Sequence, residues 1–120
     1  MFFIMIQISF CALANRETDS LIHIVHEYEK KAHFESDTNY IKTLIEIAKT
    51  FGTANPDSTL LFGRKAYELS TRYNYYKGII SSAFTIVPIY SRQQDIQNLI
   101  QIGNKIIPID RKSTRLNSSH

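Results

Sequence analysis

The sequence has little cysteine, and its one thiol, Cys11, lies within an N-terminal apolar run. A disulfide and a cysteine-based metal site both need cysteine, so neither can form in the chain beyond residue 14. The sequence also lacks a glycine-rich phosphate loop, a GxSxG nucleophile elbow and an HExxH zinc helix. We therefore assign no catalytic residue, no cofactor and no metal ligand, and expect no enzyme activity within these residues.

The sequence also lacks an apolar run long enough to cross a membrane, which needs roughly 20 residues. Its apolar run, residues 1–14, reads MFFIMIQISFCALA and ends in the small-x-small pattern of Ala12, Leu13 and Ala14. This pattern predicts a signal peptide cleaved after Ala14, and thus a protein exported to a periplasmic or other extracytoplasmic location. A buried core helix and a permanent anchor are the alternatives. No Lys or Arg precedes the run, which is unusual for a signal peptide and suggests that the natural start lies upstream of Met1.

The last eleven residues, 110–120, read DRKSTRLNSSH and show neither helical nor strand periodicity. Residue for residue, they resemble the conceptual translation of a sequencing-library adapter. This resemblance implies a non-native, disordered tail, and a natural protein that continued beyond Ile109, so that the chain is an N-terminal fragment. Arg111, Lys112 and Arg115 against Asp110 contribute +2 of the net charge of +3. The rest is near neutral, which argues against binding to nucleic acid.

One complete amphipathic helix is expected over residues 57–72. Pro56 cannot continue an earlier helix, the side chains of Asp57 and Ser58 can bond free amides at its start, and Asn74 tolerates the left-handed conformation that ends helices. Two small residues, Gly63 and Ala66, lie on its apolar face. They predict close approach of the helix that forms a hairpin with it.

Helical spacing of apolar residues also predicts other helices, and no stretch shows convincing strand alternation. Short loops between them favour antiparallel neighbours. Pro88 is expected to bend its helix near Phe84 and Thr85, and Pro108 to mark a helix end. The fold class is thus all-α, with helices expected over residues 18–34, 40–51, 57–72, 76–92 and 96–107.

Three histidines, His23, His26 and His33, fall in or near the first expected helix. His23 and Glu27 are four residues apart and could meet on one face, but a metal site needs a third ligand from elsewhere. Surface histidines without metal are the expected state, and a metal-dependent enzyme is the remote alternative.

The chain contains an internal repeat of about 40 residues. The string around Gly63, FGRKA, returns around Gly103 as IGNKI, and the Ile47, Ala48 and Phe51 pattern returns 39 residues later. Two helices per unit that leave one apolar face uncovered are typical of a helical-hairpin solenoid.

With these motifs the chain resembles a tetratricopeptide repeat (TPR) protein. The resemblance implies a short α-solenoid of two antiparallel hairpins, residues 37–75 and 76–109, after a leading helix in residues 15–36. The second hairpin is degenerate, since Val87 replaces a small residue and Pro88 interrupts its first helix. The implied packing positions are Leu44, Ile47, Ala48, Phe51, Thr59, Gly63 and Ala66 in the first repeat, and Ala83, Ile86, Val87, Tyr90, Leu99, Gly103 and Ile106 in the second.

A narrower resemblance involves the order of signal peptide, leading helix, DTNYI, NPDSTLLFGRKAYELS and NYYKGI. It is similar to the start of extracytoplasmic repeat domains of bacterial sensor histidine kinases and related regulators, in which a transmembrane helix and a signalling module follow. The resemblance implies a protein-interaction scaffold in a truncated signal-transduction protein. A stand-alone secreted or periplasmic TPR scaffold is the alternative.

The resemblance also implies a concave binding face formed by the first helix of each hairpin, with a protein or peptide as partner. Ordinary surface or inter-repeat positions are the other reading of the same residues. Tyr73, Tyr75 and Tyr76 are expected to pack between hairpins rather than on bases. The candidates for the concave face are Lys42, Ile45, Lys49, Ser81, Phe84 and Arg92.

Overall fold

The computed structural model describes residues 16–118, so the expected signal peptide and its cleavage point lie outside the described residues. Every regular element in this part is helical, which confirms the all-α fold. The elements are α2 (Arg16–Glu29), the short 3₁₀ helix η1 (Phe34–Ser36), α3 (Thr38–Phe51), α4 (Pro56–Arg72), α5 (Tyr76–Arg92) and α6 (Ile96–Ser118).

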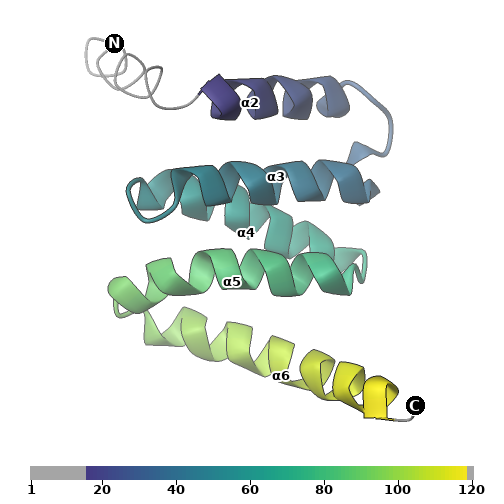
Figure 1. Ribbon diagram of the computed structural model, residues 1–120, viewed down its shortest axis with the longest axis vertical. Helices are drawn as coiled ribbons and strands as arrows, with labels where there is room; N and C mark the ends of the chain where they lie inside the picture. The colour runs from purple at the N-terminus through teal and green to yellow at the C-terminus, as the bar shows by residue number, and fades with distance from the viewer. Residues whose placement is uncertain (1–15, 119–120) are drawn as a thin grey trace.

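The helices stack in chain order, and neighbours run in opposite directions (Figure 1). Helices α3 and α5 lie on the near side of the stack, with α4 behind and between them, whereas α2 and α6 form its two ends (Figure 1). Since α4 contacts both α3 and α5, the hairpin α3–α4 packs directly on the hairpin α5–α6. The fold is a short α-solenoid of stacked antiparallel hairpins.

The turn from α3 to α4 is closed by Gly52, Asn55 and Thr59. Gly52 has φ 55°, which costs glycine little. The Asn55 side chain accepts a hydrogen bond from the Ser58 amide at 3.4 Å, and the buried Thr59 hydroxyl bonds the carbonyl oxygens of Gly52 and Asn55. The cap of α4 is therefore Asn55, one residue before Pro56, and not Asp57 or Ser58 as expected.

The other two hairpin turns share one geometry. Asn74 and Gln94 both have φ 56°, and the following amides of Tyr75 and Asp95 donate to the carbonyls of Ser70 and Tyr90 at 2.8 and 2.9 Å. This is the Schellman arrangement that ends a helix with a left-handed residue. The expected helix end at Asn74 is confirmed, and the repeated turn keeps α4, α5 and α6 antiparallel.

Apolar side chains gather in two clusters, one shared by α2, α3 and α4 and one in α5 and α6. Most residues at the expected repeat positions are buried, including Leu44, Ile47, Ala48, Gly63, Ala66, Ala83, Ile86 and Tyr90, and Phe51 is half-buried. Gly103 differs, because a Cβ atom placed there would meet nothing within 4 Å. No second helix lies against Gly103 in the described part of the chain.

The leading helix ends earlier than expected, at Glu29 instead of Phe34. His33 takes a left-handed conformation, φ 59°, and returns the chain toward α3. Phe34 then packs edge-on against Tyr40, with ring centroids 5.0 Å apart. Burial of an aromatic pair thus outweighs continuation of the helix.

Two of the three prolines, Pro88 and Pro108, lie in the interior of helices. Helix α5 runs through Pro88, and α6 runs through Pro108 to Ser118. The expected helix end at Pro108 is therefore wrong, and residues 110–118, expected to be disordered, have helical backbone. A proline removes one amide from the helix ladder, and at exposed positions such as these water can bond the carbonyl that loses its partner.

Candidate functional site

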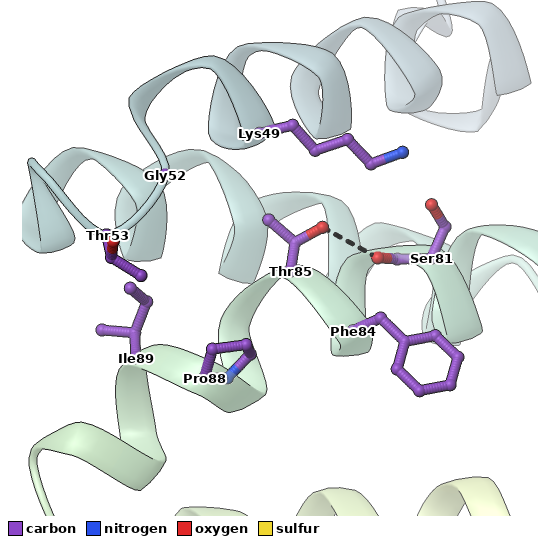
Figure 2. Close-up of a pocket in the computed structure, with 8 residues that line it drawn as sticks. All are labelled: Lys49, Gly52, Thr53, Ser81, Phe84, Thr85, Pro88 and Ile89. Carbon is purple, nitrogen blue, oxygen red and sulfur yellow. Dashed lines mark hydrogen bonds between the residues drawn. The ribbon is translucent and has the colours of Figure 1, made fainter.

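A shallow groove of about 400 Å³ runs between the end of α3 and the middle of α5. Figure 2 shows its lining: the Lys49 side chain extends along the α3 side of the groove and ends above Ser81, while Thr53 of the turn lies over Ile89. The residues that line it are Lys49, Gly52, Thr53, Ser81, Phe84, Thr85, Pro88 and Ile89.

The apolar part of this groove is unusually exposed. Phe84 has 72% of its surface accessible, and its ring points away from α5 into solvent (Figure 2). Pro88, one helical turn later, is exposed beside it. A bare phenylalanine next to a proline is an apolar surface that loses water favourably when another chain covers it.

Pro88 also changes the hydrogen bonding of the groove. Because proline has no amide hydrogen, the carbonyl of Phe84 receives no helical bond from residue 88. The Thr85 hydroxyl does not replace it, since it donates to the carbonyl of Ser81 at 2.9 Å (Figure 2). The Phe84 carbonyl in the groove wall therefore lacks its usual helical donor.

Lys49 supplies the only charged side chain of the groove lining. Its Nζ lies 3.7 Å from Glu46 Oε1, in a pair whose two side chains are both more than half exposed. Such an exposed pair contributes at most about 1 kcal/mol, so a carboxylate on a ligand can compete for the ammonium group. The groove thus combines an apolar patch, a backbone acceptor and one cation.

The structure brings together three of the six residues expected on the binding face: Lys49, Ser81 and Phe84. Lys42 and Arg92 are exposed but do not line the groove. The assignment of Ile45 to this face is wrong, because Ile45 is 3% exposed and packs in the cluster shared by α2, α3 and α4.

Sequence reasoning missed the other five groove residues: Gly52, Thr53, Thr85, Pro88 and Ile89. Pro88 was the available signal, because a proline four residues after an exposed phenylalanine frees a carbonyl on the same helix face.

The tyrosines at the opposite end of α5 behave differently from one another. Tyr75 packs against the first core cluster, whereas Tyr73 and Tyr76 are exposed and do not pack between hairpins as expected.

A second hollow lies on the side of α4 and the α5–α6 turn. Its charges are mixed: Arg64 and Lys65 face Asp57, Glu68 and Asp95, and Arg64 Nη2 lies 3.7 Å from Glu68 Oε1. Burial raises the pKa of Tyr90 in its wall, which keeps that phenol protonated. Balanced charge and exposed ion pairs favour no particular class of ligand here.

A polar cluster ties α2 to the first hairpin. The buried Tyr40 hydroxyl donates to Glu29 Oε2 at 2.9 Å, and Lys65 Nζ lies 3.5 Å from the same oxygen. Burial raises the pKa of Tyr40. Burial also acts to raise the pKa of Glu29, but the Tyr40 hydrogen bond and the Lys65 charge lower it by more, so the net shift is downward. The Glu29 carboxylate is therefore a structural anion.

No three potential ligands among His, Cys, Asp and Glu come together in residues 16–118. His26 Nδ1 lies 3.4 Å from Glu29 Oε1, and His23 and His33 are exposed. None of the described helices is long and apolar enough to cross a membrane.

Comparison of the chain with protein-family models, with curated proteins and with solved structures finds no match.

Proposed function

We propose that the chain is a TPR-like protein-interaction scaffold whose α3–α5 groove binds a segment of a protein partner. The observation that carries the proposal is the exposed Phe84 beside Pro88 and Lys49, on the face formed by the first helices of the two hairpins. In stacked helical hairpins this face is available to extended chains, because the second helices cover the opposite side.

The chemistry of the groove suggests what the segment contains. An aromatic or large aliphatic side chain would cover Phe84 and Pro88, and an Asp or Glu would pair with Lys49. A backbone amide between the two would donate to the free carbonyl of Phe84. The preferred ligand is therefore a short extended peptide with an apolar and an acidic residue a few positions apart.

A random peptide library displayed on phage and selected on the immobilised chain tests this proposal. We expect enriched peptides to share an apolar and an acidic residue, and Phe84→Ala and Lys49→Glu to weaken their binding at least tenfold, or about 1.4 kcal/mol. Leu61→Ala is the matched control, since Leu61 is equally exposed on α4 but outside the groove. Selected peptides that bind Phe84→Ala as well as the unchanged chain would refute the groove.

The proposed setting is extracytoplasmic, as the sensory part of a histidine kinase or transcriptional regulator, with a stand-alone periplasmic scaffold as the alternative. The apolar run with Ala12 and Ala14 supports export. Export can be tested by fusing residues 1–20 to a reporter enzyme that is active only outside the cytoplasm. Ala12→Asp and Ala14→Asp should prevent cleavage of the fusion. A reporter that stays inactive would contradict export. A natural reading frame that continues into a membrane span would favour the kinase setting.

A further inference from the structure

Helix α3 carries three charged residues on one exposed face. Lys42, Glu46 and Lys49 are spaced by four and three residues, so their side chains lie on the same side of the helix, and all three are exposed. Glu46 Oε1 lies 3.7 Å from Lys49 Nζ. Lys42 makes no ion pair with any side chain that the structure describes. The face therefore extends from the groove, which Lys49 lines, to a second cation nearer the start of α3.

The distance between the two lysines matches the repeat of an extended peptide. Seven residues of α-helix rise about 10 Å. A chain in the polyproline II conformation, an extended form that needs no neighbouring strand, has three residues per turn and rises about 3.1 Å per residue. Residues i and i+3 of such a chain therefore point to the same side, about 9 Å apart. The flexible lysine side chains can span the remaining difference.

The shared direction of α3 and α5 sets the order of the partner's side chains (Figure 1). The Lys49 side chain ends above Ser81 (Figure 2). Phe84 and Pro88 follow Ser81 along α5. Lys42 lies in the opposite direction, since it precedes Lys49 on α3. An acid held by Lys49 would therefore lie between the apolar residue of the partner and a second acid held by Lys42.

We propose that the segment bound in the α3–α5 groove carries two acidic residues three positions apart, one held by Lys49 and the other by Lys42. This partner class rests on the proposed function and narrows it to an acid-x-x-acid sequence, with the apolar residue beyond the acid on Lys49. Glu46 lies between the two lysines and repels a third acid in the intervening positions. Lys42 is thus a specificity-determining residue, and the site selects the spacing of the acids and not the total negative charge.

A series of peptides of equal charge tests the proposal. The starting peptide is one selected on the groove, with one apolar and one acidic residue, acetylated and amidated so that it carries no terminal charge. A second Asp is placed two, three, four or five positions from the first acid, on the side away from the apolar residue. Fluorescence anisotropy at about 10 mM ionic strength, where exposed charges are little screened, gives the affinities. We expect the spacing of three to bind best, about threefold more tightly than the starting peptide, as one exposed ion pair allows.

Variants of Lys42 assign the register. Lys42→Ala should remove the gain from the second Asp and leave the affinity of the starting peptide unchanged, whereas Lys42→Arg should keep the gain. Lys105→Ala, which removes an exposed lysine of α6 outside the groove, is the matched control. Lys42 is exposed and alanine favours helix, so Lys42→Ala should leave helical circular dichroism unchanged.

The outcomes separate the diacidic partner from the groove itself. If Phe84→Ala weakens the starting peptide but all spacings bind alike, or if the gain survives in Lys42→Ala, the second acid has no place on α3 and only the diacidic class is overturned. Affinity that rises with the number of acids at any position also overturns it, because the attraction is then unspecific. If no bound peptide depends on Phe84, the groove and the diacidic class are both overturned.

Discussion

Ile86 of α5 lies so close to Gly63 of α4 that a Cβ atom on Gly63 would collide with the Cγ2 methyl of Ile86. The same position is 3.7 Å from the Cβ of Ala48, so α3, α4 and α5 meet at one glycine. Gly63 therefore fixes the distance between the two hairpins, where α4 meets α5, as well as the distance between α3 and α4 within the first hairpin.

Gly63→Ala should destabilise the protein by about 1–3 kcal/mol, because the added methyl overpacks a closed contact. Gly103→Ala is the control with the opposite expected sign. Its methyl has open space, and replacing a helical glycine by alanine stabilises by up to about 1 kcal/mol. Urea unfolding followed by circular dichroism measures both values. Equal effects of the two substitutions would mean that α5 does not pack on Gly63.

Ser70→Ala is expected to stabilise the fold by about 1 kcal/mol. The Ser70 hydroxyl is fully buried against Gly78 and has no hydrogen-bond partner in the structure, so the folded state carries its desolvation cost. Ser82→Ala is the matched control, since the equally buried Ser82 hydroxyl donates to the Gly78 carbonyl at 2.6 Å. Ser82→Ala should not stabilise. A loss of stability in Ser70→Ala would reveal a partner for its hydroxyl.

Acid should weaken the attachment of α2 through Glu29. The folded state holds the pKa of Glu29 below its ordinary value of about 4.3, so the carboxylate stabilises the fold at neutral pH. As the pH falls below about 4.3 the unfolded chain binds the proton first, and this stabilisation is lost as the pH falls through the folded pKa. The contribution is below about 1 kcal/mol because Glu29 is partly exposed and screened.

The control for this pH dependence is a second glutamate of α2. Glu29→Gln should lower stability at pH 7 and reduce the loss between pH 5 and pH 3, as measured by thermal unfolding at each pH. Glu17→Gln, an exposed glutamate at the other end of α2, should change neither quantity much. An unchanged acid profile in Glu29→Gln would rule out Glu29 as the group responsible.

The helices and their order follow from the sequence because apolar periodicity and end signals agree over α3, α4 and α5. Where they disagree, tertiary contacts decide. Phe34 continues the helical pattern of α2, yet its contact with Tyr40 bends the chain into a turn. At Pro108 the local signal for a helix end is outweighed, since one missing amide does not stop a helix that continues on both sides.

The groove was only partly predictable for a similar reason. Ile45 lies on the helix face that the repeat pattern assigns to binding, but the local pattern cannot show that Ile45 packs in the cluster formed with α2 and α4. Phe84 follows the same repeat logic and is bare. The difference depends on which neighbours cover each position, and that is a property of the assembled stack and not of any one helix.

Pro88→Ala links stability to the groove. Restoring the amide at residue 88 allows the helical bond to the Phe84 carbonyl, and alanine has the higher helix propensity, so α5 should gain up to about 3 kcal/mol in the free energy of unfolding. The same bond occupies the acceptor proposed to receive a peptide amide, and the exposed proline ring of the groove lining is lost. Pro88→Ala should therefore be more stable, yet bind selected peptides more weakly.

Pro56→Ala is the control for the two effects expected of Pro88→Ala, higher stability and weaker peptide binding. Pro56 is the first residue of α4, where an amide has no partner within the helix, so its replacement should leave stability nearly unchanged and cannot affect a groove that it does not line. Urea unfolding and peptide titration on both variants give the two quantities. If Pro88→Ala gained stability and kept full peptide affinity, the free carbonyl of Phe84 would have no part in binding, and the groove would act through its apolar surface and Lys49 alone.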